Sequence, residues 1–159
     1  MVVPSVHVVL RMVDIKSQIE DYLKLLDMKH TWNSKKKLFE LVFSERKDSK
    51  TATHDDDSAF QYTIYISPGS KWVQIFTDVY PVTNIPEKKR EKVFLELLFA
   101  NRKYAEVCFD FDKDRKMIGS SQEMKVQGLN LDGFRAEFLA VPWAVKKFWT
   151  EIAPKFGLK

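Results

Sequence analysis

Residues 90–124 constrain the fold more than any other part of the chain, because the spacing of their apolar side chains changes from helical to extended. The first part places residues at intervals of three and four, as on one helix face: Val93, Phe94, Leu97, Leu98 and Asn101. From Tyr104 to Phe111 apolar and polar residues alternate, which predicts a strand. A polar turn over 112–116 leads to a second strand from Met117. A helix followed by an antiparallel hairpin is typical of an α+β domain, since parallel strands need a longer connection.

The rest of the chain supplies further helices and strands of the same kind. Strands are predicted over residues 38–44, 60–67 and 71–80, and helices over 12–28 and 132–153, the first with Ser17 as a candidate cap. The element order is therefore α-β-β-β-α-β-β-α. We expect one domain over residues 1–159, a five-stranded, mainly antiparallel sheet with helices on one face.

Two features of the connections matter for this fold. Residues 29–37 and 45–59 are polar, and they predict a connector and a hairpin loop, while residues 1–10 fit either a strand or the start of a helix. Pro142 stands within the last predicted helix. Because proline removes a backbone donor, this helix either kinks there or ends and is followed by a second helix.

Composition sets limits on location and partners. The 159 residues carry a net charge of +4 with both signs interspersed, which is not a strong basic footprint. The single cysteine, Cys108, excludes an internal disulfide and favours a reducing compartment. The longest apolar run, 138–145, is too short to span a bilayer, and the N-terminus lacks the features of a signal peptide. We expect a cytoplasmic protein without membrane contact.

No group of residues predicts catalysis, a cofactor or a metal site. Asp110, Asp112 and Asp114 begin like an EF-hand loop, but Arg115 stands where glycine is needed and Ser121 where the bidentate glutamate is needed. Residues 54–57 (His-Asp-Asp-Asp) have metal-ligand chemistry in a loop without a second cluster. Cys108 has no histidine motif to act as its base. We therefore expect a solvated hairpin turn, an acidic loop and a small half-buried cysteine.

Two short basic clusters leave a second class of function open. Lys35–Lys37 and Lys88–Arg90 can contact phosphates, with Trp32 as a stacking platform. Acidic residues follow both clusters closely, so a solubilising surface is the alternative interpretation. Weak nucleic-acid binding through these two clusters is therefore kept only as the alternative function.

The middle and the end of the chain resemble a known family. The segments LLFANRKYAEVCFDFDKDRKMIGSSQEM (97–124) and FRAEFLAVPWAVKKFW (134–149) resemble the YbjN-like family, which has the type III secretion chaperone-like fold. The shared pattern is a leucine-rich helix ending near an asparagine, a strand, an acidic turn, a second strand and a closing helix. The resemblance implies a non-enzymatic binding module, in some cases dimeric, that holds another polypeptide or acts in regulation. It implies no catalytic residues.

Aromatic side chains on the third predicted strand form the candidate binding surface. Trp72, Phe76 and Tyr80 alternate with Val73 and other aliphatic residues, and Tyr65 on the neighbouring strand can join them. If helices cover the aliphatic side, these four aromatics lie on the opposite side, where a large exposed apolar patch marks an interface. The alternative is cover within the monomer by the closing helix or the N-terminal segment. We thus predict a protein partner or a second copy of the chain, bound through an apolar sheet face or groove.

Overall fold

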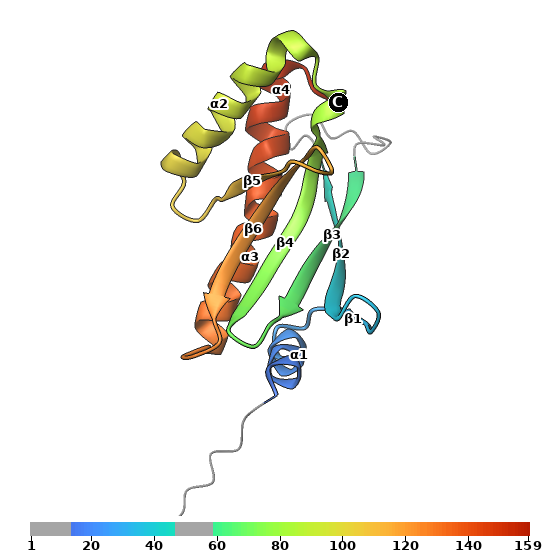
Figure 1. The fold of residues 1–159 in the computed structure, drawn as a ribbon, viewed down its shortest axis with the longest axis vertical. Helices are drawn as coiled ribbons and strands as arrows, with labels where there is room; N and C mark the ends of the chain where they lie inside the picture. Colours follow the sequence, from blue (N-terminus) through green and yellow to red (C-terminus); the bar gives the residue numbers. More distant parts are fainter. Residues whose placement is uncertain (1–13, 47–58) are drawn as a thin grey trace, which may run out of the picture.

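The computed structural model describes residues 14–46 and 59–159, and six strands of these residues form one antiparallel sheet. The spatial order is β1-β2-β3-β4-β6-β5 (Figure 1). The first four strands are therefore neighbours in chain order, whereas β6 pairs with β4 and leaves β5 at the edge of the sheet. The strands are β1 (Thr31–Asn33), β2 (Leu38–Arg46), β3 (Ala59–Pro68), β4 (Trp72–Pro81), β5 (Phe109–Asp112) and β6 (Met117–Lys125).

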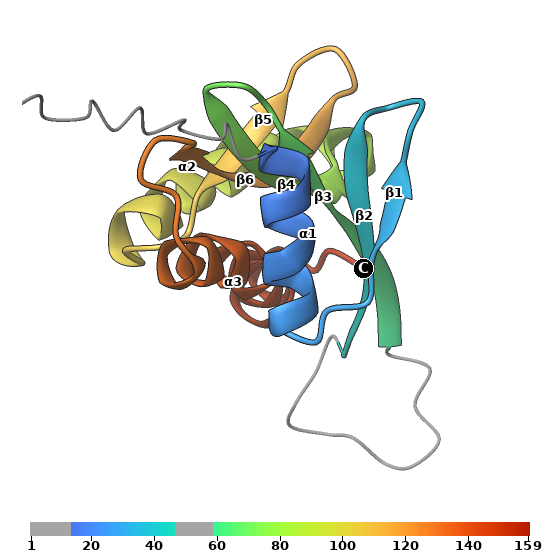
Figure 2. The ribbon, with the colours of Figure 1, turned by 90° about the horizontal axis from the view of Figure 1, so that it is seen from below.

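The described helices lie on one face of this sheet, as expected (Figure 2). They are α1 (Ile15–Leu25), α2 (Glu87–Lys103) and α3 (Leu131–Lys147), followed by a π-helical segment η2 (Phe148–Ile152) and the short α4 (Ala153–Phe156). A 3-10 turn, η1 (Val82–Asn84), joins β4 to α2. The α+β class is confirmed, together with the antiparallel pairing.

The core lies between the sheet and the closing helix. The predicted apolar face of that helix is confirmed, since all its members are buried: Phe134, Phe138, Val141, Val145, Phe148 and Ile152. They meet alternate residues of the central strands, including Ile64 and Ile75. Helix α3 passes through Pro142 without ending, and Gly157 closes the last turn in the left-handed conformation. Of the two outcomes considered at Pro142, a helix end is excluded.

The strand count was wrong by one. Residues 31–33 lie in the segment expected to be a polar connector, yet they form β1 and pair with the start of β2. Within it Trp32 packs edge-on against Phe39, with ring centroids 4.8 Å apart. Three residues are too few to show alternation, so the pattern gave no sign of this strand.

The predicted core face of α2 was also wrong in part. Val93, Leu97 and Ala100 point into the core, whereas Leu98 is 65% exposed. Leu95 and Phe99 are exposed beside it. Because α2 carries apolar residues on opposite sides, spacing alone did not decide which side packs.

Smaller differences concern element ends. Asp14, rather than Ser17, caps α1 by accepting hydrogen bonds from the backbone N–H groups of Lys16 and Ser17. The strand expected from Tyr104 begins at Phe109. The predictions for residues 1–10, for the larger part of the 45–59 loop and for the acidic run 54–57 fall outside the described residues.

Candidate functional site

A break in strand pairing decides which aromatic residues share a surface. The β4–β6 register shifts between Asp78 and Tyr80, which is the signature of a β-bulge. One extra residue sends every later side chain to the other face. Tyr80 is therefore only 5% exposed, and its ring packs 5.4 Å from that of Phe148. Its expected place beside Trp72 and Phe76 was wrong.

The other three predicted residues do lie together on the sheet face opposite the described helices. Tyr65 and Phe76 are paired across β3 and β4, and their rings stack with centroids 5.3 Å apart. Trp72, on the same side of β4, is 45% exposed. We call Tyr65, Trp72 and Phe76 the aromatic patch. The closing helix packs on the opposite face and does not cover it, while the N-terminal segment lies outside the described residues.

Lysines accompany two of these rings. The ammonium of Lys36 lies 5.7 Å from the ring centroid of Tyr65, and that of Lys125 lies 5.6 Å from the ring of Trp72. Each ammonium is attracted by the electron-rich face of its ring, so the patch carries positive charge at its edges. The patch is therefore amphipathic rather than purely apolar.

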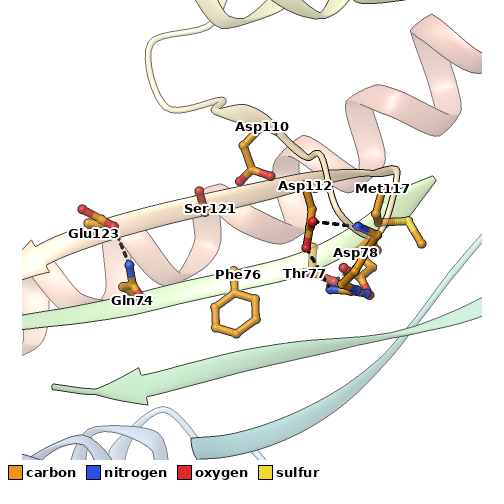
Figure 3. Close-up of a pocket in the computed structure, with 11 residues that line it drawn as sticks. Gln74, Phe76, Thr77, Asp78, Asp110, Asp112, Met117, Ser121 and Glu123 are labelled. Atoms are coloured by element: carbon orange, nitrogen blue, oxygen red, sulfur yellow. Dashed lines mark hydrogen bonds and ion pairs between the residues drawn. The ribbon is translucent and has the colours of Figure 1, made fainter. Parts of the chain in front are cut away.

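A hollow of about 270 Å³ adjoins the patch at Phe76. Its floor is Gly119 of β6, which is paired with Asp78 of β4 on one side and Asp110 of β5 on the other. A Cβ built on Gly119 would come within 2.5 Å of Asp110 Oδ1, so the Asp110 carboxylate takes the space that a side chain at position 119 would need. Figure 3 shows Phe76 and Ser121 between acidic groups at both ends of the hollow.

Acidic side chains outnumber basic side chains around the hollow. Arg115 pairs with Asp78 and lies 3.8 Å from Asp112, and Glu123 accepts a 2.6 Å hydrogen bond from Gln74. Asp110 is exposed, but partial desolvation of its carboxyl group and the carboxylates of Asp78 and Asp112 raise its pKa, although a hydrogen bond with Ser121 acts against this. The hollow is thus a negative site on a chain of positive net charge.

The acidic turn and the cysteine have structural explanations. The Asp112 carboxylate accepts hydrogen bonds from the backbone N–H groups of Asp114 and Arg115, which shapes the hairpin turn. Cys108 is exposed rather than half-buried. Although the residue is exposed, desolvation of the thiol by neighbouring atoms and the carboxylates of Asp110 and Glu123 raise the pKa of the thiol, which disfavours the nucleophilic thiolate.

The two basic clusters do not form one surface. Lys35–Lys37 lie in the β1–β2 turn and Lys88–Arg90 at the start of α2, at opposite ends of the long axis (Figure 1). Lys89 donates a 2.7 Å hydrogen bond to the Phe156 carbonyl, and Arg90 donates one to Ile85. The cationic groups of both side chains are therefore engaged in hydrogen bonds to backbone carbonyl groups. Trp32, the proposed stacking platform, packs against Phe39.

One apolar surface was missed at the level of sequence. Leu95, Leu98 and Phe99 stand on the outer side of α2, each more than half exposed. Their three-and-four spacing was visible in the sequence, on the side of the helix opposite the core. We call these three residues the α2 stripe.

In the described part of the chain no helix is both long and apolar enough to cross a membrane.

Comparison with known proteins shows the fold. No family model and no curated protein matches the chain. Among solved structures, the HopA1–SchA chaperone–effector complex matches with a TM-score of 0.54 at 10% identity, over 84% of this chain and 91% of the other. YbjN from E. coli matches with a TM-score of 0.54 at 10% identity, over 84% and 90%. The ExoU–SpcU complex of the Pseudomonas aeruginosa type III secretion system matches with a TM-score of 0.51 at 12% identity, over 88% and 98%.

The chain therefore has the YbjN-like, type III secretion chaperone-like fold. This confirms the structural part of the resemblance found in the sequence.

Proposed function

We propose that this protein binds a segment of another polypeptide on the helix-free sheet face, through Tyr65, Trp72 and Phe76. The observation that carries the proposal is the stacked Tyr65–Phe76 pair beside a half-exposed Trp72, on a face that no described helix covers. Large aromatic side chains left at the surface in a group are characteristic of interfaces.

The energy available from this patch is adequate for a specific contact. An aromatic residue buries roughly 150–250 Å² when fully covered, so the exposed half of Trp72 offers about 100 Å². At about 25 cal/mol per Å² this is about 2.5 kcal/mol for Trp72 alone. Tyr65 and Phe76 are more covered already and add less each, but they lie in contact and act as one surface.

The structural neighbours support a protein-binding role. One of them is a complex of a chaperone with its effector, and another is a heterodimeric complex of a type III secretion system. We extend this to the present chain as a non-enzymatic role, chaperone-like or regulatory, in the cytoplasm.

A second surface favours self-association. The α2 stripe exposes three large apolar side chains on one helix side, which in water is a cost unless a partner covers them. A second copy of the chain would cover both stripes at once through a two-fold axis. We assign the possible homodimer to this stripe and the heterologous partner to the aromatic patch.

Nucleic-acid binding has less support. Lys89 and Arg90 are engaged with carbonyl groups, and the other basic cluster lies at the far end of the molecule. A phosphate backbone would have to contact both clusters to gain from their charge.

Capture of partners from a lysate, with and without nuclease, tests the proposal. The variants are Trp72→Ala/Phe76→Ala and, as a matched control, Leu95→Ala/Leu98→Ala, which removes two exposed apolar side chains elsewhere. Light scattering and thermal unfolding first establish the mass and folding of each variant.

The proposal predicts a protein partner that the first variant loses and the control retains, with nuclease having no effect. Loss of mass only in the control would place self-association on the α2 stripe. Capture that vanishes with nuclease and ignores both variants would contradict the proposal.

A further inference from the structure

The hollow beside the aromatic patch is acidic, although the whole chain is positive. Four carboxylates line it and only one guanidinium does: Asp78, Asp110, Asp112 and Glu123 against Arg115. The net charge of the chain is +4, so this excess is local. A partner that docks on the aromatic patch meets this negative field immediately beside it.

Asp110 and Glu123 are the two carboxylates of the hollow without a counter-charge among the described residues, and of the two only Asp110 lies against Gly119. Arg115 is shared by Asp78 and Asp112, and Glu123 is bonded to Gln74. Among residues 14–46 and 59–159 no lysine, arginine or histidine forms an ion pair with Asp110. Its carboxylate leans over Gly119, where the sheet has no side chain.

We propose that the bound segment places an arginine in this hollow, with its guanidinium against the Asp110 carboxylate, which itself lies over Gly119. This rests on the proposed function, since the arginine belongs to the segment that covers the aromatic patch. The aliphatic part of the arginine lies along Phe76, the ring of the patch that lines the hollow and over which the described residues place no ammonium.

The chemistry favours arginine over other groups. A guanidinium is planar, weakly hydrated and able to bond a carboxylate with two parallel N–H groups while its stem packs on an aromatic ring. The hollow, at about 270 Å³, is smaller than the roughly 300–1,000 Å³ of pockets that hold whole small molecules. One side chain of a larger partner fits it better than a free metabolite.

The electrostatic state of Asp110 agrees with this occupant. Its pKa is raised by partial desolvation and by the carboxylates of Asp78 and Asp112, and the hydrogen bond with Ser121 compensates the ionised form only in part. An incoming cation supplies the missing compensation and stabilises the ionised form.

The spacing of Trp72 and Phe76 along β4 also limits the sequence of the bound segment. Trp72 and Phe76 are four residues apart on β4, about 13 Å at the rise of an extended chain. An extended segment running along β4 therefore contacts Trp72 with a side chain about four positions from its arginine. A segment with arginine and leucine at this spacing engages both parts of the face.

The test uses two acetylated, amidated peptides that differ at one side chain. Both carry a leucine four positions from the variable residue on a serine–glycine background; one has arginine there and the other the neutral isostere citrulline. Dissociation constants and backbone amide shifts are measured by NMR titration to millimolar peptide. The proteins are wild type, Asp110→Asn and the charge-matched control Glu91→Gln, an exposed carboxylate on α2.

We expect the arginine peptide to bind wild type about two- to fivefold more tightly than the citrulline peptide, the effect of one half-exposed ion pair. The largest shifts should fall on Gly119 and Ser121. Asp110→Asn should abolish the preference, whereas Glu91→Gln should keep it. Thermal unfolding confirms that both variants fold.

The outcomes separate this inference from the proposed function. Equal binding of both peptides, lost in Trp72→Ala/Phe76→Ala, would overturn the arginine site and leave sheet-face docking intact. A preference for arginine that survives in that double variant would support the contact with Asp110, but it would contradict both the packing of the arginine stem on Phe76 and the role of the aromatic patch. Absence of any arginine-dependent shift at Gly119 and Ser121 would overturn the inference.

Discussion

Leu97 and Leu98 are adjacent, identical in chemistry and placed in opposite environments, so they test the orientation of α2. Leu97 is 4% exposed and belongs to the core, while Leu98 is 65% exposed. Truncating each to alanine changes the same atoms and the same helix. The difference between the two variants therefore reports packing alone.

The expected magnitudes differ widely. Leu97→Ala removes a buried side chain and leaves a cavity, which should lower the free energy of unfolding by about 2–5 kcal/mol. For a chain of this length that corresponds to a fall in Tm of roughly 2–4 °C per kcal/mol. Leu98→Ala removes atoms that water already surrounds, and should change the free energy of unfolding by about 0.5 kcal/mol or less.

Urea unfolding followed by tryptophan fluorescence measures both values. The experiment is repeated at two protein concentrations, because self-association through the α2 stripe would make the loss in Leu98→Ala depend on concentration. Equal losses in both variants, or a larger loss in Leu98→Ala at low concentration, would refute the assignment of Leu97 to the core.

Three further perturbations follow from single contacts. Tyr80→Ala should cost about 3–5 kcal/mol in urea unfolding, because Tyr80 is packed in the core rather than on the aromatic patch; a near-neutral result would contradict the bulge. Asn101→Ala should cost about 1–3 kcal/mol, since Asn101 exchanges two hydrogen bonds with the backbone of Phe109; unchanged stability would contradict this tie between α2 and β5. Asp110→Asn should be more stable than wild type at neutral pH. The raised pKa means that ionising Asp110 disfavours the native state, and this penalty appears as pH rises above the ordinary value of 3.8. The difference in free energy of unfolding between Asp110→Asn and wild type should therefore shrink as the pH falls toward 3.8. A difference that stays constant from neutral to acid pH would refute the assignment.

Elements with one apolar side were predictable from the sequence. The closing helix repeats its apolar residues on a single side from Phe134 to Ile152, and all of them are buried. The strand that contains Ile64 alternates without interruption, so its inward and outward residues were assigned in advance. In both cases only one arrangement hides the apolar side chains from water.

Elements with two apolar sides were not predictable in this way. Helix α2 has Leu97 on one side and Leu98 on another, and only the position of the sheet decides between them. The bulge near Asp78 has no residue signature, yet it moves Tyr80 from the expected surface into the core.

One part of the candidate site was predictable from the sequence and the other part was not. Tyr65, Trp72 and Phe76 could be placed on one face because each follows from alternation before the bulge. The hollow could not be predicted, because Asp78, Asp110 and Gly119 come from three strands whose order in the sheet is not encoded by local spacing.

Site-specific photo-crosslinking tests whether the helix-free sheet face contacts another polypeptide at Phe76. The photoreactive residue p-benzoylphenylalanine replaces Phe76 in one variant and, as a matched control, Leu98 in another, and adducts formed in the source cell are identified by mass spectrometry. We expect a heterologous polypeptide crosslinked from position 76, with position 98 giving either no adduct or a second copy of this chain. A heterologous polypeptide attached only at position 98, with none at position 76, would contradict the assignment of the helix-free sheet face as the binding surface.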